Sequence, residues 1–241
     1  MTVAAAALCA AVGYGADAIE SQVVGFQSYN AAVSDDMSTI GVAFANTAVA
    51  DGDYVISDKI FNRDVEDSDQ FLVWDNDMYN LINYTYYDGV GWVVTWADGS
   101  EEAVEGNAIT IKKGQVIWFL PVTPDADTIV TGNVAPSGTQ TLTFTPGGDE
   151  GDCFAFVNPF PVDTKFADLT TFCEDSDQFL LWDNANYNLI NYTYYDGVGW
   201  VITDALGAET AASEEDIAIP AGQGAYFLPC EERTWTVTFT Y

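Results

Sequence analysis

The chain is patterned in short segments in which apolar and polar residues alternate, with turn-forming residues between them. A period of two is typical of β-strands that bury one face. The clearest such segment covers residues 79–87, and it runs into Asp88-Gly89-Val90-Gly91, a tight turn in which glycine supplies positive φ without steric cost. The pattern predicts strands at residues 70–75, 79–87, 92–96, 108–111 and 116–120, with the last two forming a hairpin.

Residues 66–121 are repeated at 174–229, without a gap and at a constant shift of 108 residues. The two copies are identical at 37 of 56 positions, and a duplication of this length indicates two copies of one folding unit. Outside the copies, strands are expected at 128–131, 139–144 and 234–241, and the acidic segments 101–106 and 209–215 are expected to be loops or at most a turn of helix.

Many short strands with closely spaced turns are typical of sandwiches and small barrels. The prediction is therefore an all-β protein made of two tandem homologous β-sandwich or small β-barrel domains, residues 19–133 and 134–241, with a boundary where Gly, Pro and Ser gather.

The charge balance restricts the classes of partner. The chain has 37 acidic and 6 basic residues, a formal net charge of −31, and no histidine. Binding to nucleic acid requires Lys and Arg to displace counterions, so no nucleic-acid partner is expected. The absence of histidine removes the commonest general base and zinc ligand. A carboxylate pair of the glycosidase kind is not singled out by any motif, and we expect no enzyme activity.

Residues 1–18 are apolar, rich in alanine, and end in the small-x-small pattern Ala16-Asp17-Ala18. This pattern predicts a secretory signal peptide cut after Ala18, with a short buried helix as the alternative. No later apolar run approaches 18 residues, so membrane insertion is not expected. The predicted location is extracellular or at the cell surface, with the periplasm as the alternative.

Cys173 and Cys230 flank the second copy of the repeat, at positions where the first copy has Val65 and Val122. Two cysteines that replace valines together at both edges of one unit predict a Cys173–Cys230 disulfide in an oxidising compartment. Cys153 is the alternative partner for either of them.

Acidic residues gather before and after the first strand of each copy. Calcium binds 6–8 oxygen atoms, several of them from carboxylates, so these clusters are candidate Ca²⁺ sites and the alternative is a solvated acidic loop. The candidate ligands are Asp67, Asp69 and Asp75 in the first copy and Asp175, Asp177 and Asp183 in the second.

Each copy places a tryptophan directly after the glycine turn and a tyrosine before it, namely Trp92 with Tyr86 and Trp200 with Tyr194. Sugar rings stack on exposed aromatic side chains, so these four residues are candidate glycan contacts if both indoles are exposed on one face. The alternative is that the rings fill the core, where a large aromatic side chain buries about 150–250 Å².

The repeat signature is QFL-x-WD, then NYTYYDGVGWV, then a GQ-x-x-x-FLP close. It resembles the secreted β-repeat surface proteins of planctomycete and verrucomicrobial bacteria. Residues 220–227 match the closing motif of that family, whereas the first copy departs from the motif at Lys112, Lys113 and Val116. The resemblance implies an exported β-protein and carries over no catalytic residue.

These features favour a secreted, acidic, non-enzymatic structural or adhesive surface protein that acts through self-association or partner binding. The alternative hypothesis is a carbohydrate-binding module that recognises cell-surface polysaccharide, with calcium support. The C-terminal strand, which alternates threonine with apolar residues, is a candidate for pairing with another subunit.

Overall fold

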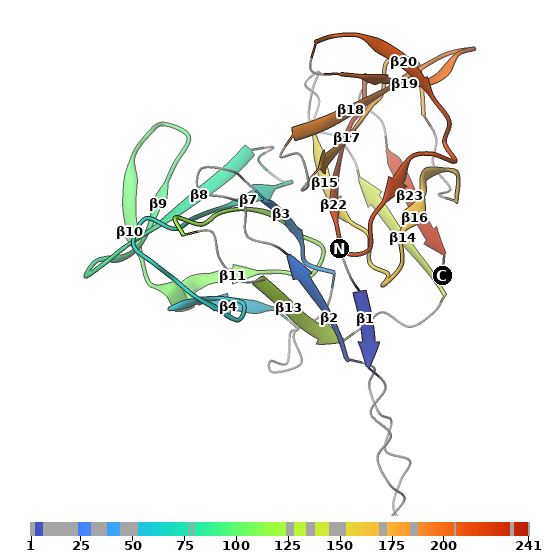
Figure 1. Cartoon of the computed structure of the whole chain (residues 1–241). Coiled ribbons are helices and arrows are strands. Elements are labelled where there is room, and N and C mark those ends of the chain that lie inside the picture. Colours follow the sequence, from blue (N-terminus) through green and yellow to red (C-terminus); the bar gives the residue numbers. More distant parts are fainter. Residues whose placement is uncertain are drawn as a thin grey trace, which may run out of the picture.

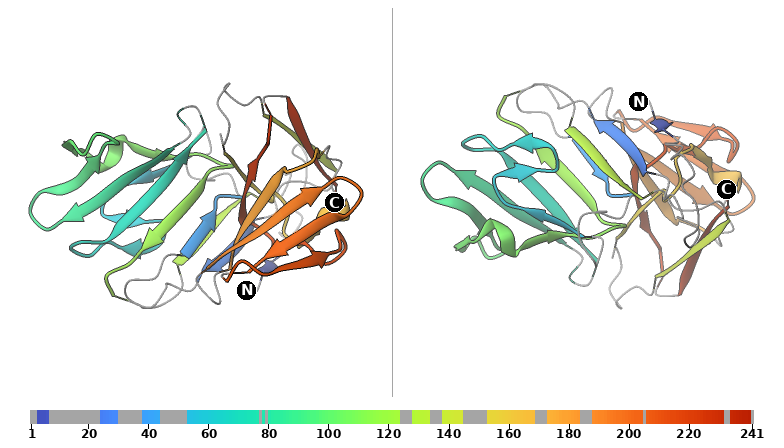
Figure 2. Two further views of the ribbon diagram at one scale, coloured as in Figure 1. Left: turned by 90° about the horizontal axis from the view of Figure 1, so that it is seen from above. Right: turned by 90° about the horizontal axis from the view of Figure 1, so that it is seen from below.

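The computed structural model describes residues 3–6, 24–29, 38–43, 53–76, 78, 80–123, 128–133, 138–144, 153–168, 173–183, 188–204, 206–231 and 234–240. Within these residues the fold is all-β, with strands paired antiparallel throughout. Figure 1 shows the N-terminal half and the C-terminal half as two groups of strands, and Figure 2 shows them from above and below.

The N-terminal half is built on a six-stranded sheet with the order β10-β9-β8-β7-β12-β3. Its strands are β3 (Ser38–Gly41), β7 (Gln70–Asp75), β8 (Asn80–Tyr87), β9 (Gly91–Thr95), β10 (Glu101–Val104) and β12 (Val116–Leu120). Smaller sheets accompany it: β4 (Tyr54–Ile56) with β11 (Ile109–Ile111), β5 (Lys59–Ile60) with β6 (Arg63–Asp64), and β2 (Val24–Tyr29) between β1 (Val3–Ala6) and β13 (Thr128–Asn133). A 3-10 turn, η1, covers Gly106–Ala108.

The C-terminal half has a six-stranded sheet of matching order, β15-β22-β17-β18-β19-β20. Its strands are β15 (Phe154–Val157), β17 (Gln178–Asp183), β18 (Asn188–Tyr195), β19 (Gly199–Thr203), β20 (Glu209–Ala212) and β22 (Gly224–Leu228). β16 (Thr164–Lys165) pairs with β21 (Ala218–Ile219), β14 (Thr139–Phe144) pairs with β23 (Trp235–Thr240), and the 3-10 turn η2 covers Phe166–Asp168.

The pairing register is the same in the two large sheets once the shift of 108 residues is applied. Gln70 pairs with Thr85 in the first sheet and Gln178 with Thr193 in the second, and the same holds along β8–β9 and β18–β19. Because a slip of one residue would turn every side chain to the other face, identical register keeps the same positions buried in both sheets.

Each half has a core on one face of its large sheet. In the N-terminal half, apolar residues of β7, β9 and β12 pack against those of β4, β11 and β13, and Figure 1 shows these two groups of strands across from each other. In the C-terminal half, phenylalanine is the commonest core residue, and Val237 and Phe239 of β23 are among the fully buried residues.

The predicted strands β7, β12 and β14 have their predicted bounds, and the glycine turns are confirmed because Gly89 and Gly197 have φ of 77° and 74°. Two expectations were wrong. β11 pairs with β4 instead of forming a hairpin with β12, because β12 already pairs with β7 on one side and β3 on the other. The acidic segments are outer strands, β10 and β20, since exposed carboxylates are well tolerated at a sheet edge.

Of the predicted signal peptide, only Val3–Ala6 falls among the described residues, and it forms β1, paired antiparallel with β2. Cleavage after Ala18 therefore stays a prediction. No helix among the described residues is long and apolar enough to cross a membrane.

Candidate functional site

The acidic residues before the first repeat strand form a tight hydrogen-bonded turn. Asp69 N–H donates to the Glu66 carbonyl at 3.0 Å, and Ser68, which has φ of 71°, donates its N–H to the Tyr86 carbonyl at 2.7 Å. Asp67 is exposed, and its carboxylate accepts the backbone N–H of Asp88 at 2.7 Å. The turn therefore ties the start of β7 to the far end of β8.

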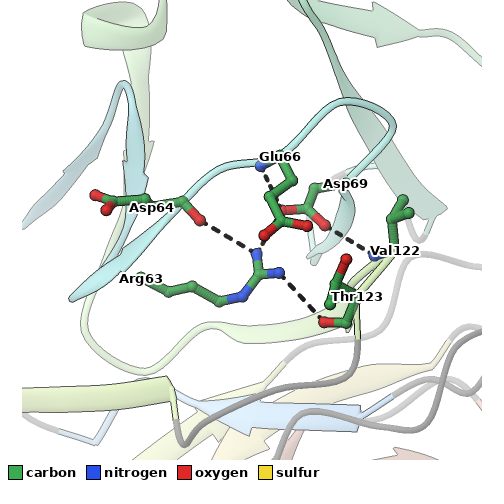
Figure 3. Close-up of polar contacts among 6 residues, drawn as sticks. All are labelled: Arg63, Asp64, Glu66, Asp69, Val122 and Thr123. Atoms are coloured by element: carbon green, nitrogen blue, oxygen red, sulfur yellow. Dashed lines mark hydrogen bonds and ion pairs between the residues drawn. The ribbon is translucent and has the colours of Figure 1, made fainter.

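Asp69 is fully buried and accepts hydrogen bonds from three directions (Figure 3). One carboxylate oxygen accepts from the Arg63 guanidinium and from Glu66 N–H at 2.9 Å, and the other accepts from Val122 N–H at 2.9 Å. Arg63 is itself buried and lies over the ring of Phe119, with 5.1 Å between its Cζ and the ring centroid. The hydrogen bonds that Asp69 accepts from Glu66 N–H and Val122 N–H fix the two ends of the first copy against each other, and Arg63 neutralises the buried carboxylate.

The second copy repeats the turn. Asp177 is fully buried, and its carboxylate accepts Glu174 N–H at 2.8 Å and Cys230 N–H at 2.9 Å. Asp175 accepts Asp196 N–H at 2.8 Å, as Asp67 accepts Asp88 N–H in the first copy. The acidic signature thus has a structural use in both copies.

The calcium hypothesis gains no support from this geometry. Asp69 and Asp177 already bind backbone N–H groups, and Asp75 accepts the N–H of Met78 at 3.2 Å, while Asp183 ends β17. Among the described residues, no three acidic or cysteine side chains are grouped closely enough to hold a metal ion. Calcium binding at Asp67, Asp69, Asp75, Asp175, Asp177 and Asp183 stays a prediction.

The condition for glycan stacking, exposure of both indoles, is not met, and the alternative that these rings fill the core is confirmed. Trp92 and Trp200 are each 1% exposed, and both rings lie in the cores of their halves. Trp92 packs edge-on against Phe71 and donates Nε1–H to the Ser57 carbonyl at 2.6 Å, while Trp200 packs edge-on against Phe166. Burial wins because a large aromatic side chain contributes more in a core than on a strand face.

Tyr86 and Tyr194 are half-buried and make edge-to-face contacts with Trp92 and Trp200. A surface hollow of about 440 Å³ opens beside Tyr86. The remainder of its lining includes Ser57, Asp58, Val90 and Glu105, so an aromatic edge and two carboxylates face the same space.

No disulfide bond joins Cys153, Cys173 or Cys230, so the predicted Cys173–Cys230 bond is not observed. The two positions are nevertheless close, because Asp177 binds the N–H of Glu174, next to Cys173, and the N–H of Cys230 with one carboxylate. Burial raises the pKa of the Cys153 thiol to about 12, so this thiol stays protonated and poorly nucleophilic at neutral pH.

Sequence reasoning missed a cluster of aromatic side chains that lies where the two halves meet. We call it the repeat interface: Gly41, Trp74, Val116 and Trp118 of the N-terminal half, with Val157, Trp182, Gly224 and Tyr226 of the C-terminal half. β12 contacts β15 and β22, and β22 contacts β3. The junction therefore lies at the β12–β3 edge of the first large sheet and the β22–β15 edge of the second (Figure 2).

The aromatic contacts of the repeat interface are reciprocal. Trp74 packs against Tyr226 with centroids 5.8 Å apart, and Trp182 packs against Trp118 with centroids 4.7 Å apart. Under the shift of 108 residues, Trp74 corresponds to Trp182 and Trp118 to Tyr226, so the second contact is the first one with the halves exchanged. The two halves are therefore related across the interface by an approximate two-fold axis.

Polar groups also cross the interface. The side-chain amide of Asn76 pairs with the backbone of Ala155, donating to its carbonyl at 3.0 Å and accepting its N–H at 2.9 Å. Trp74 donates Nε1–H to the Cys153 carbonyl at 3.1 Å. Burial raises the pKa of Tyr226 well above its ordinary value, so this phenol stays neutral in the contact. Trp74 and Trp182 are half-buried. Their retention in both copies was the signal in the sequence.

Comparison with known proteins gives no relative for the chain: no family model, no curated protein and no solved structure matches it.

Proposed function

We propose that the chain is a secreted, non-enzymatic structural or adhesive protein, made of two homologous β-domains from an internal duplication, that acts by self-association or partner binding at a cell surface. The matching strand order and register of the two large sheets support the duplication. The aromatic cores on one face of each large sheet are what a sandwich or small barrel needs. A Cys173–Cys230 bond formed in an oxidising compartment belongs to the same proposal.

One observation carries the proposal of assembly: the ribbon formed by β14 and β23 has an uncharged surface. Thr139, Thr141 and Thr143 are exposed on β14 and pair in register with Thr240, Thr238 and Thr236 on β23. Among the described residues, β14 has a strand on one side only. The chain has a net charge of −31, but this ribbon carries no charged side chain that would prevent its edge from pairing with the edge of a second copy.

The test is the molar mass of the full chain by light scattering over a range of protein concentrations. We expect mass that rises with concentration, and we expect Thr141→Asp to suppress the rise because it places like charges on opposing ribbons. Thr210→Asp on the already acidic edge strand β20 is the matched control. A mass that stays at 26.1 kDa at every concentration would refute assembly.

The hollow beside Tyr86 favours a second candidate function, the binding of a glycan. Its volume of about 440 Å³ falls in the range of small-molecule sites, about 300–1,000 Å³, and its carboxylates are suited to accept hydrogen bonds from sugar hydroxyls.

If this site binds a glycan, Tyr86→Ala is expected to weaken binding about two- to tenfold, since an aromatic contact is worth about 0.5–1.5 kcal/mol beyond its buried area. Isothermal titration of the full chain with soluble oligosaccharides measures this. Tyr194→Ala, the equivalent change in the other half, is the control. Equal loss in both variants, or no binding by the unmodified chain, rejects the candidate.

A further inference from the structure

The residues that meet across the repeat interface are complementary in size, in addition to making reciprocal aromatic contacts. Gly41 pairs with Val116 in β3–β12, and Val157 pairs with Gly224 in β15–β22, so Gly41 and Val157 hold equivalent places, as do Val116 and Gly224. Across the interface, each glycine meets the valine at its equivalent position. Each equivalent pair therefore combines one small and one large residue.

Neither glycine has space beside it for a Cβ atom. A Cβ atom on Gly224 would lie within 3.0 Å of three side-chain carbon atoms of Val116. A Cβ atom on Gly41 would lie 2.8 Å from Val157 Cγ1 and closer still to the carbonyl oxygen of Gly222. Packed interiors do not absorb such overlaps without moving backbone or side chains.

This size pattern selects the partner of each face. Two N-terminal halves brought together in the same way would place Val116 against Val116 and leave a void between two copies of Gly41. Two C-terminal halves would place Val157 against Val157 and leave a void at Gly224. Collision and void both disfavour like-with-like pairing, so each face fits the other half and not itself.

The contact does not depend on the chain connection. β13 ends at Asn133 and β14 begins at Thr139, whereas the residues of the repeat interface lie elsewhere in the chain. The same residues can therefore meet within one chain or between two, and the effective concentration set by the short connection favours the closed chain at low protein concentration.

Resting on the assembly proposed above, we infer that copies of the chain join through the repeat interface, with the N-terminal face of one copy binding the C-terminal face of a second copy. The partner is a second copy of this chain, and the exchanged contact keeps every aromatic and glycine–valine pair of the closed chain. This surface is distinct from the β14–β23 ribbon.

The test uses two full-length variants with opposite faces blocked. Gly41→Val blocks the N-terminal face and leaves the C-terminal face intact, whereas Gly224→Val does the reverse. When the two variants are refolded together, the intact N-terminal face of one meets the intact C-terminal face of the other. Native mass spectrometry is expected to show a mixed species with one copy of each, at about twice 26.1 kDa, that neither variant forms alone.

Ala103→Val on β10 and Ala211→Val on β20 are the matched controls, because these exposed positions lie at the opposite edges of the two sheets. Their mixture is expected to form no more dimer than the unmodified chain. If a valine variant fails to fold, Trp118→Ala and Trp182→Ala replace the pair, since they weaken opposite faces by truncation instead of overpacking.

Absence of the mixed dimer from folded variants overturns the inference. If the unmodified chain still gains mass with concentration in that case, assembly stands and proceeds through another surface. If the mixed dimer forms while the unmodified chain stays at 26.1 kDa, the two faces can be exchanged between copies but the unmodified chain keeps them closed, and both the inference and the proposed assembly fail.

Discussion

Asp69→Ala is expected to lower the free energy of unfolding by about 3–5 kcal/mol, the usual cost of removing one partner from a buried ion pair. The substitution leaves the buried Arg63 guanidinium without its carboxylate and leaves Glu66 N–H and Val122 N–H without their acceptor. Since small domains have a total stability of about 5–15 kcal/mol, a loss of this size is a large fraction of the whole.

Denaturant unfolding followed by fluorescence measures the change. Asp67→Ala is the matched control, because Asp67 lies in the same turn but is exposed and accepts one backbone N–H. We expect it to change stability by less than about 1 kcal/mol. Equal effects from Asp67→Ala and Asp69→Ala would contradict the assignment of Asp69 as the buried anchor of the turn.

The strands of the large sheets were predictable because local pattern determines them. A short apolar and aromatic run predicted β7, and the glycine turn predicted the β8–β9 connection, so both follow from neighbours in the sequence. The partner of β11 was not predictable, because pairing with β4 depends on strands far away in the chain that compete for the edges of β12.

The chemistry of the acidic and aromatic residues was less predictable than the strands. Asp67 and Asp69 are two residues apart and look alike in sequence, yet one is exposed and the other is buried against Arg63 and Val122. Trp92 next to a glycine turn is compatible with a surface ring or with a core ring, and the packing of Phe71 against it shows that it is core. Both differences come from long-range contacts that a periodic pattern does not contain.

The repeat interface was hidden for a related reason. The duplication identified Trp74 and Trp182 as equivalent, but equivalence alone does not place one half against the other. The replacement of Val116 by Gly224 at equivalent positions was visible in the sequence, but only the contact across the interface shows that the packing is complementary.

Gly224→Val is expected to destabilise the protein more than any other change at this interface whose effect a second substitution, Val116→Gly, can reverse. Overpacking of a tight contact costs about 1–3 kcal/mol, and the three nearest atoms that a Cβ at this position would meet belong to the side chain of Val116. Val116→Gly alone is also destabilising, because it removes a fully buried side chain. Together the two changes exchange the positions of the large and the small residue and restore the fit.

The double-mutant cycle of Val116→Gly and Gly224→Val, measured by denaturant unfolding of the full chain, tests most directly the claim that the two halves are joined by a size-matched interface. We expect the double variant to be more stable than the sum of the single effects predicts, by about 1–3 kcal/mol of coupling. Additive losses, with no coupling, would show that Val116 and Gly224 do not pack against each other and would contradict the repeat interface.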